Sequence, residues 1–250
     1  MPTMRDSRMP DDWIMSAVQG NPIQKVIDPA TGKWDGNIRS CPVRLTYFND
    51  SLHVAVTGKN DNGTDKTPGF ETAMLFPWCA NDQVNDILVP LIRDAERKAH
   101  PSFFDEQTGK SFGLHWPIRD QGDKRKYSGY TPGSFMATAK TQYKPQIVDP
   151  AMNPIVDPSL AYPGVWAIVV FNLFPYGGGQ RPRPIKGVNL GLQLVMRIAD
   201  DQKLIGGAVD PKKVMAGVRI DAKFDPGSAF SGSNPPPPAN RAPPNAEDLA

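Results

Sequence analysis

Apolar residues of this chain recur with a period of two more often than with the helical period of 3.6. In residues 187–199, apolar side chains occupy every second position from Val188 to Ile198. This alternation predicts a strand with one buried and one largely polar face. Residues 164–176 (GVWAIVVFNLFPY) are almost continuously apolar and predict a long central strand, at least partly covered on both faces. Further strands are predicted for residues 43–48, 69–78 and 133–143.

One segment has a clear helical period. Its apolar stripe consists of Val84, Ile87, Leu88, Leu91, Ile92 and Ala95. Asn81 or Asp82 can cap its start, and basic residues follow toward its end. Pro90 inside the segment predicts a kink or an interruption. Five or more strands with one helix after the first hairpin, joined by long loops, predict a barrel or a sandwich with a helical insertion.

The two ends of the chain differ from its middle. Residues 224–250 contain 7 prolines and almost no side chain able to fill a core. They predict a disordered tail, with a short polyproline II stretch at Pro235 to Pro238. Residues 1–36 are rich in turn-forming pairs and predict an irregular lead-in. The expected organisation is therefore a lead-in over 1–36, one domain over 37–223 and a tail over 224–250.

Composition and charge narrow the function classes. Two cysteines in 250 residues exclude a disulfide scaffold, and no window approaches the roughly 18 apolar residues of a membrane-spanning helix, so we expect a soluble, cytoplasmic protein. The net charge of +2 combines −4 over residues 1–109, +8 over 110–223 and −2 over 224–250. The basic middle could face a phosphate backbone, although scattered lysines on a solvated surface would give the same sum.

Residues for catalysis, metal or cofactor binding do not form known patterns. His53, His100 and His115 each lack a second ligand at metal-binding spacing. The string Thr108–Ser111 resembles the end of a phosphate-binding loop, but Phe104 stands where that loop needs glycine. We therefore expect no enzyme activity, no metal and no cofactor.

The basic middle section interleaves aromatic and cationic side chains. Such mixtures bind single strands, because cations follow the phosphates while rings stack on bases, whereas duplex readers present a basic helix or ribbon to a groove. The candidate DNA-binding residues are Lys124, Arg125, Lys126, Tyr127, Tyr130, Lys140, Tyr143, Lys144, Tyr176, Arg181, Arg183 and Lys186. Trp166, Phe171 and Phe174 could equally belong to the core, because they lie in the most apolar strand.

Four ordered segments resemble a family of bacteriophage single-stranded-DNA-binding proteins built on one OB-fold. They are WPIRDQGD (116–123), GYTPGSFMATAKTQYKPQIVD (129–149), YPGVW (162–166) and GVNLGLQLVMRIADDQKLIGG (187–207). The resemblance implies a five-stranded OB-fold barrel with one helix and long loop insertions, which holds DNA on its middle strands and loops. The chain departs from the family pattern at the extra Gln121, the polar insertion 49–68 and the proline-rich end.

The resemblance also suggests a role for the tail and leaves other functions open. The end AEDLA resembles the acidic termini with which replication-type single-strand binders recruit replication or recombination proteins and compete with DNA; Glu247, Asp248 and Leu249 would be its contacts. A tail that only solubilises the protein is the simpler alternative. A virion assembly protein and a strand-annealing protein remain alternative functions, and the sequence leaves the oligomeric state open.

Overall fold

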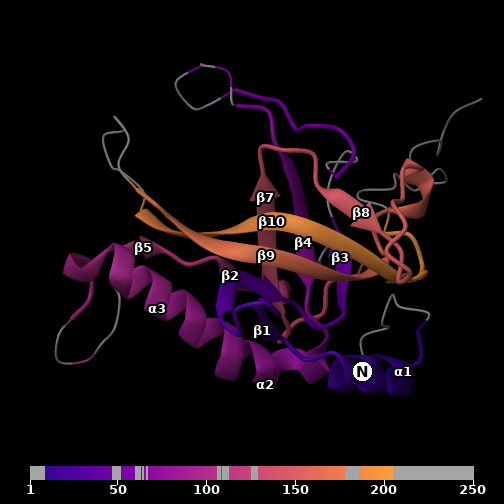
Figure 1. The fold of residues 1–250 in the computed structure, drawn as a ribbon, viewed down its shortest axis with the longest axis horizontal. Helices are drawn as coiled ribbons and strands as arrows, with labels where there is room; N and C mark the ends of the chain where they lie inside the picture. Colours follow the sequence, from indigo (N-terminus) through magenta and orange to yellow (C-terminus); the bar gives the residue numbers. More distant parts are fainter. Residues whose placement is uncertain are drawn as a thin grey trace, which may run out of the picture. The chain divides into compact units, whose positions relative to one another are not determined.

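The computed structural model describes residues 9–46, 52–59, 63, 65, 67–105, 108, 113–124, 129–177 and 186–204. Residues Met1–Gly207 form one unit, and the fold below is that of this unit (Figure 1). The predicted tail, 224–250, lies outside the described residues.

Strands are the main regular structure of the unit. They are β1 (Gln24–Ile27), β2 (Trp34–Arg39), β3 (Val43–Thr46), β4 (Phe70–Leu75), β5 (Leu114–His115), β6 (Ile118–Asp120), β7 (Phe135–Thr141), β8 (Gln146–Val148), β9 (Trp166–Tyr176) and β10 (Lys186–Ala199). The α-helices are α1 (Asp11–Gly20), α2 (Asn81–Gln83) and α3 (Val89–Ala99), and the π-helical turn η2 (Val84–Leu88) joins α2 to α3. Short 3-10 turns are η1 (Trp78–Ala80), η3 (Pro101–Phe103), η4 (Gln121–Lys124) and η5 (Pro158–Leu160).

Five strands close into a barrel in the order β9, β3, β4, β7, β10 and back to β9. All of these pairings are antiparallel except β7 with β10, which is parallel and aligns Leu190 and Gly191 with Ala139 and Lys140. In Figure 1, the long strands β9 and β10 cross in front of β3, β4 and β7. The predicted fold class, an OB-fold barrel with one long helix, is confirmed.

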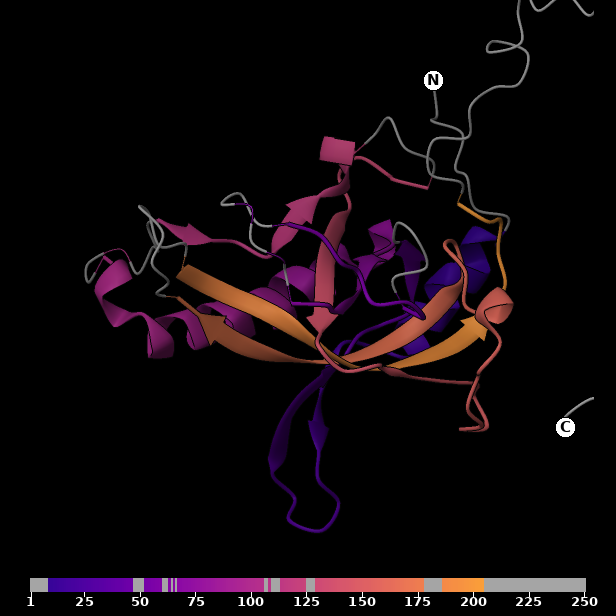
Figure 2. The ribbon, with the colours of Figure 1, turned by 90° about the horizontal axis from the view of Figure 1, so that it is seen from above.

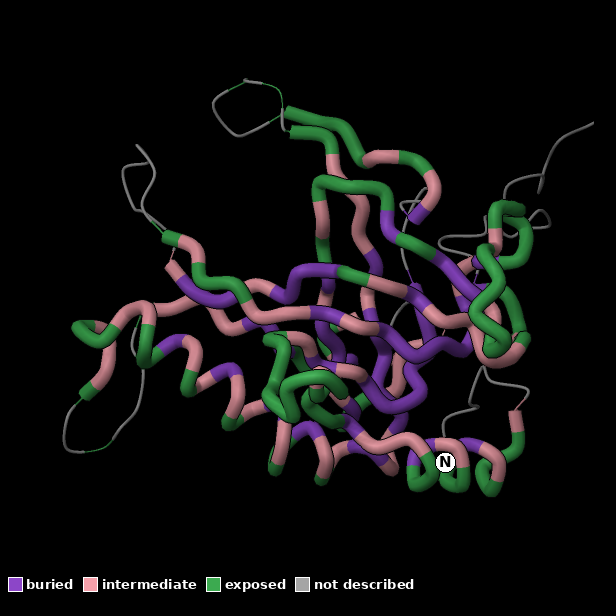
Figure 3. Tube along the Cα trace, in the orientation of Figure 1, coloured by how far each residue is buried: buried purple, intermediate pink, exposed green. Residues whose placement is uncertain are grey.

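The alternation in the last strand matches its burial. Val188, Leu190 and Leu192 are at most 2% exposed and face the core. Beyond Leu192, a register shift against β9 disturbs the pattern, and Leu194, Met196 and Ile198 are only half-buried. In β9, burial on both faces holds only from Trp166 to Val169, because the far end of the strand runs past the core. Figure 3 shows the buried positions gathered where the strands cross.

The predicted helix is present from residue 81 to 99, and Pro90 changes its hydrogen bonding. Just before Pro90 the helix widens into the π-helical turn η2, whose end is marked by the bond from Val89 N to Val84 O. A proline has no N–H to donate to the preceding turn, so a local change in the bonding pattern is expected there. Val84, Leu88 and Ile92 are fully buried and join the helix to the core.

Residues 1–36, for which the sequence predicts irregular structure, contain α1, β1 and part of β2. Ile14 and Val18 lie one turn apart on α1 and are buried, and Trp13 packs edge-on against Trp166 with ring centroids 5.7 Å apart. The helical spacing of Trp13, Ile14, Ala17 and Val18 extends over only about two turns, so the periodic signal in the sequence is short. Residues 37–39 of β2 pair with β9, and from there the β1–β2 hairpin extends away from the barrel (Figure 2).

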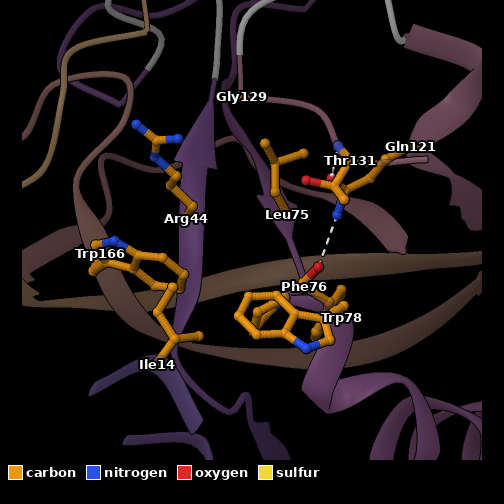
Figure 4. A pocket seen from close by; sticks show the side chains of 10 residues that line it. Ile14, Arg44, Leu75, Phe76, Trp78, Gln121, Gly129, Thr131 and Trp166 are labelled. Atoms are coloured by element: carbon orange, nitrogen blue, oxygen red, sulfur yellow. Dashed lines mark hydrogen bonds between the residues drawn. The ribbon is translucent and has the colours of Figure 1, made fainter. Parts of the chain in front are cut away.

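One end of the barrel is closed by side chains around a pocket of about 50 Å³, too small for a nucleotide (Figure 4). Gln121, the extra residue relative to the family pattern, is 1% exposed there. Its Nε2 donates to Phe76 O (2.8 Å) and Phe135 O (2.7 Å), and its Oε1 accepts from Thr131 N (2.8 Å). The extra residue therefore ties together the ends of β4 and β7 and the loop that precedes β7.

Residues 200–204, here called the strap, follow β10 and cross this same end of the barrel. Trp166 Nε1 donates to Asp201 Oδ2 (2.7 Å), and the same carboxylate lies 3.5 Å from Arg44 Nε. Arg44 Nη2 donates to Gln202 O (2.7 Å), and Leu204 N donates to Pro163 O (2.7 Å). Gly164 has a φ of +111°, and a Cβ there would lie 2.3 Å from Gln202 O, so the strap passes where only glycine fits.

Candidate nucleic-acid interface

A groove of about 820 Å³ lies at the other end of the β4–β7 pair. Phe70 and Glu71 begin β4 and pair with Thr141 and Lys140, which end β7. The strands β9 and β10 pass beside this point, and residues 142–145 continue from β7. The groove is lined by Val56, Thr67, Gly69, Phe70, Glu71, Lys140, Thr141, Gln142, Tyr143, Lys144, Pro145, Asn172, Phe174, Asn189, Gly191, Leu192 and Gln193.

The floor of the groove is the outward face of β9 and β10. Phe171 is buried in the core, whereas its neighbour Asn172 and the next outward residue, Phe174, line the groove. Gly191 of β10 lies in register with Asn172. A Cβ on Gly191 would lie 2.1 Å from Asn172 Oδ1 and 3.3 Å from Phe174 Cδ1. Glycine at this position therefore lets both side chains lie across β10.

Two aromatic rings of the groove are open to solvent. Tyr143 is 81% exposed and Phe174 is 41% exposed. Tyr176 follows Phe174 on the same face of β9, but its ring is half-buried edge-on against His115, with centroids 6.4 Å apart. Burial raises the pKa of the Tyr176 hydroxyl, so the ring stays neutral. Exposed flat rings are suited to stacking on planar ligands.

The groove carries two lysines with different surroundings. Lys140 Nζ lies 3.1 Å from Glu71 Oε2, and both side chains are partly exposed. Lys144 is exposed, and within the described part of the chain it forms no ion pair. Burial, together with the cations Arg119 and Lys140, lowers the pKa of His115, so this nearby imidazole is neutral at pH 7.

The structure brings some of the sequence-derived candidates together and separates others. Lys140, Tyr143 and Lys144 share the groove. Tyr176 lies opposite Gly187 across the β9–β10 pair, and the neighbouring Lys186 has its Nζ 4.7 Å from the centre of the Phe103 ring.

Two candidates lie toward the closed end of the barrel. Tyr130 packs against the small apolar cluster of Leu75, Met136 and Leu204, and Lys124 ends η4. The other candidates lie outside the described residues: Arg125, Lys126, Tyr127, Arg181, Arg183, Glu247, Asp248 and Leu249.

Sequence reasoning did not select several residues of the groove. The sequence left Phe174 open between core and surface, and it did not point to Glu71 or to the amides of Asn172, Asn189 and Gln193. A usable signal exists in β9, where the polar Asn172 interrupts an apolar run and thereby marks the outward face. Assigning Phe174 to that face needs only the period of two from Asn172.

The described residues contain little that suggests other chemistry. No three His, Cys, Asp or Glu side chains among them are grouped as metal ligands would be. Cys41 is buried, and burial raises the pKa of its thiol, which disfavours the reactive thiolate. No helix within the described ranges is long and apolar enough to cross a membrane.

Comparison with known proteins gives a family and related folds. The model of the family described as Enterobacter phage Enc34, ssDNA-binding protein, matches residues 37–224. The structure resembles the single-stranded DNA-binding protein from bacteriophage Enc34, with 17% identity, a TM-score of 0.51 and coverage of 77% of this chain and 98% of that one.

Two further solved structures have lower TM-scores. The Enc34 protein in complex with ssDNA gives 18% identity, a TM-score of 0.47 and coverage of 67% of this chain and 89% of that one. The single-stranded DNA-binding protein gp2.5 of bacteriophage T7 gives 14% identity, a TM-score of 0.46 and coverage of 76% of this chain and 98% of that one. No curated protein matches the chain.

Proposed function

The chain belongs to the family of the Enterobacter phage Enc34 ssDNA-binding protein, and on this basis we propose that it binds single-stranded DNA without sequence preference and is not an enzyme. The groove of β4, β7, β9 and β10 is the proposed site. The observation that carries the proposal is the placement of Tyr143 and Phe174, two exposed rings, beside Lys140 and Lys144 in one groove. Rings that stack on any base and cations that attract phosphates bind single strands without reading their sequence.

The amides on the floor of the groove support the same function. Asn172, Asn189 and Gln193 offer both hydrogen-bond donors and acceptors to bases or sugars. The groove follows a barrel surface of crossed strands, and none of the described helices projects from it, so it favours a flexible single strand over the grooves of a duplex. The protein would coat single strands in the host cytoplasm during phage DNA replication or recombination.

The tail is proposed to recruit replication proteins. The charge of the tail supports this proposal, because residues 224–250 have a net charge of −2 and the preceding segment, 110–223, has a net charge of +8. An acidic segment tethered to a basic domain competes with DNA phosphates for the same cations. Glu247, Asp248 and Leu249 are the proposed contacts for partner proteins.

A titration of labelled oligothymidylate, with full-length protein and with a chain ending at residue 223, tests the function and the tail together. We expect tight single-strand binding, weak duplex binding and a slope of log K against log salt of about −0.7 for each phosphate neutralised. The shortened chain should bind equally well or more tightly. Equal affinity for duplex would contradict the function, and lost affinity in the shortened chain would contradict competition by the tail.

Glu71 is expected to oppose DNA binding, because its carboxylate lies 3.1 Å from Lys140 Nζ in the groove. A phosphate that approaches Lys140 meets this negative charge. Glu71→Gln should therefore raise single-strand affinity by about 3- to 10-fold at low salt, and less as salt screens the charge. Anisotropy titrations at two salt concentrations measure the change. Asp86→Asn, at an exposed acid of the helix, is the matched control and should leave the affinity unchanged. A lower single-strand affinity of the Glu71→Gln variant would contradict this expectation and would mean that Glu71 positions Lys140 for binding.

A further inference from the structure

A second cavity of about 280 Å³ lies next to the groove. It is lined by His53, Lys144, Pro145, Gln146, Ile147, Val148, Met152, Pro154, Ile155 and Val156. Lys144 and Pro145 line the groove as well, so these two residues form the wall between the two cavities. A ligand that extends along the groove past Tyr143 reaches the second cavity by crossing Lys144.

The interior of the second cavity is mainly apolar, and strand pairing and a backbone hydrogen bond hold its walls in place. Ile147 and Val148 are each 5% exposed, and both belong to β8, which pairs with β10. Ile155 N donates to Ile147 O at 2.7 Å and holds the opposite wall against β8. The volume lies just below the roughly 300–1,000 Å³ of cavities for drug-sized molecules, which suits a single flat ring better than a longer ligand.

The edge of the second cavity contains an unusual backbone conformation. Met152 has a φ of +66°, the only positive φ at a non-glycine residue within the described ranges. The turn is held by Met152 N donating to Asp149 O (2.9 Å) and by Asn153 N donating to Asp149 Oδ1 (2.8 Å). Hydrogen bonds from Asn153 also lower the pKa of Asp149, which keeps the carboxylate charged.

Glycine and asparagine adopt this left-handed conformation more readily than methionine. The chain nevertheless places an apolar side chain there, and that side chain is 57% exposed. Residues held in such sparsely populated backbone conformations are concentrated at active sites and ligand-binding sites. Beside the cavity, Val156 is also exposed, at 85%.

We propose that the second cavity is a base-binding subsite, which extends the single-strand site beyond the groove. The proposal rests on single-strand binding by the groove. A phosphate lies on Lys144, the base on one side stacks on Tyr143, and the base on the other side enters the second cavity. Ile147 and Val148 form the floor under this base, Met152 covers its face through a polarisable thioether, and Gln146 offers an amide to its edge.

Methionine oxidation tests the subsite in the unmodified protein. Met152 and Met15 are both exposed, at 57% and 42%, and Met15 lies on α1, outside both cavities. With saturating oligothymidylate, peroxide should oxidise Met152 at least fivefold more slowly, as measured by peptide mass spectrometry, while the rate at Met15 stays the same. If the oligonucleotide binds and Met152 is still oxidised at the rate of the unbound protein, the proposed subsite is wrong, but single-strand binding by the groove is not contradicted. If no oligonucleotide binds, both proposals fail.

Met152→Asn separates binding from stability. Asparagine accepts the left-handed backbone, so the melting temperature should stay the same or rise, whereas single-strand affinity should fall about 3- to 10-fold. Met15→Gln is the control and should change neither quantity. Unchanged affinity in Met152→Asn would overturn the subsite, and a lower melting temperature would show that Met152 serves the fold instead.

Discussion

Removing both exposed rings of the groove, in the double variant Tyr143→Ala with Phe174→Ala, should weaken single-strand binding at least about 30-fold. Each base stacked on an aromatic side chain contributes roughly 1–3 kcal/mol, so two lost rings cost at least about 2 kcal/mol. Tyr143 is 81% exposed and Phe174 is 41% exposed, and neither belongs to the buried core. The melting temperature should therefore change little, and anisotropy titrations together with thermal unfolding measure both effects.

The conservative variant Tyr143→Phe is the control for this experiment. It keeps the ring and removes only the hydroxyl, so it should bind within about twofold of the unchanged protein if stacking is the interaction. If Tyr143→Phe binds single strands as weakly as the double alanine variant does, the lost binding free energy belongs to a hydrogen bond of the hydroxyl instead. A large loss of stability in the double variant would mean that Phe174 supports the core, which its position on the outward face of β9 argues against.

Asp201→Ala should destabilise the fold more than any surface change. The Asp201 side chain is fully buried, accepts from Trp166 Nε1 at 2.7 Å and lies 3.5 Å from Arg44 Nε. Removing the carboxylate leaves the Arg44 guanidinium buried without this counter-charge, which typically costs about 3–5 kcal/mol. For a unit of this size the melting temperature should fall by roughly 6–20 °C, as calorimetry would measure.

Asp200→Ala is the matched control, one residue earlier in the strap. The Asp200 side chain is 65% exposed and pairs with Arg197, so its loss should cost about 1 kcal/mol or less. Well below its melting temperature, Asp201→Ala should still bind single strands, because the strap and the groove lie at opposite ends of the β4–β7 pair. Equal destabilisation by the two variants would show that the Arg44–Asp201 pair is not what holds the strap.

The strands that bury one full face could be predicted from the sequence, and those that pack at an edge could not. Val188, Leu190 and Leu192 alternate with polar residues because one face of β10 meets the core, and this regularity is visible in the sequence. The β1–β2 hairpin touches the barrel only where the end of β2 pairs with β9 and buries Ile38, and its other residues are mostly exposed, so burial imposes little pattern on it. Closure of the barrel through the parallel β7–β10 pair joins residues about 50 positions apart, which no local pattern records.

The candidate site was predictable where its residues are consecutive in the chain. Lys140, Tyr143 and Lys144 lie within five residues and share the groove, so local composition sufficed to select them. Tyr130 has similar neighbours in the sequence but packs against Leu204, far along the chain. Composition cannot distinguish these two environments. The amides of the floor belong to strands whose outward faces become known only when β9 and β10 are paired.

The order in which the chain is made has a consequence for when the groove can exist. β10, the last strand among the described residues, pairs with β5, β7, β8 and β9 and supplies Asn189, Gly191 and Gln193 to the floor of the groove. Until β10 has been synthesised, the edge of β9 opposite β2 and β3 is unpaired among the described strands, and β7 is paired on its β10 side only with β6, at residues 135–137. Such open strand edges favour aggregation. A nascent chain or fragment that ends before β10 therefore carries Lys140, Tyr143, Lys144 and Phe174 without the strand that completes the floor between them.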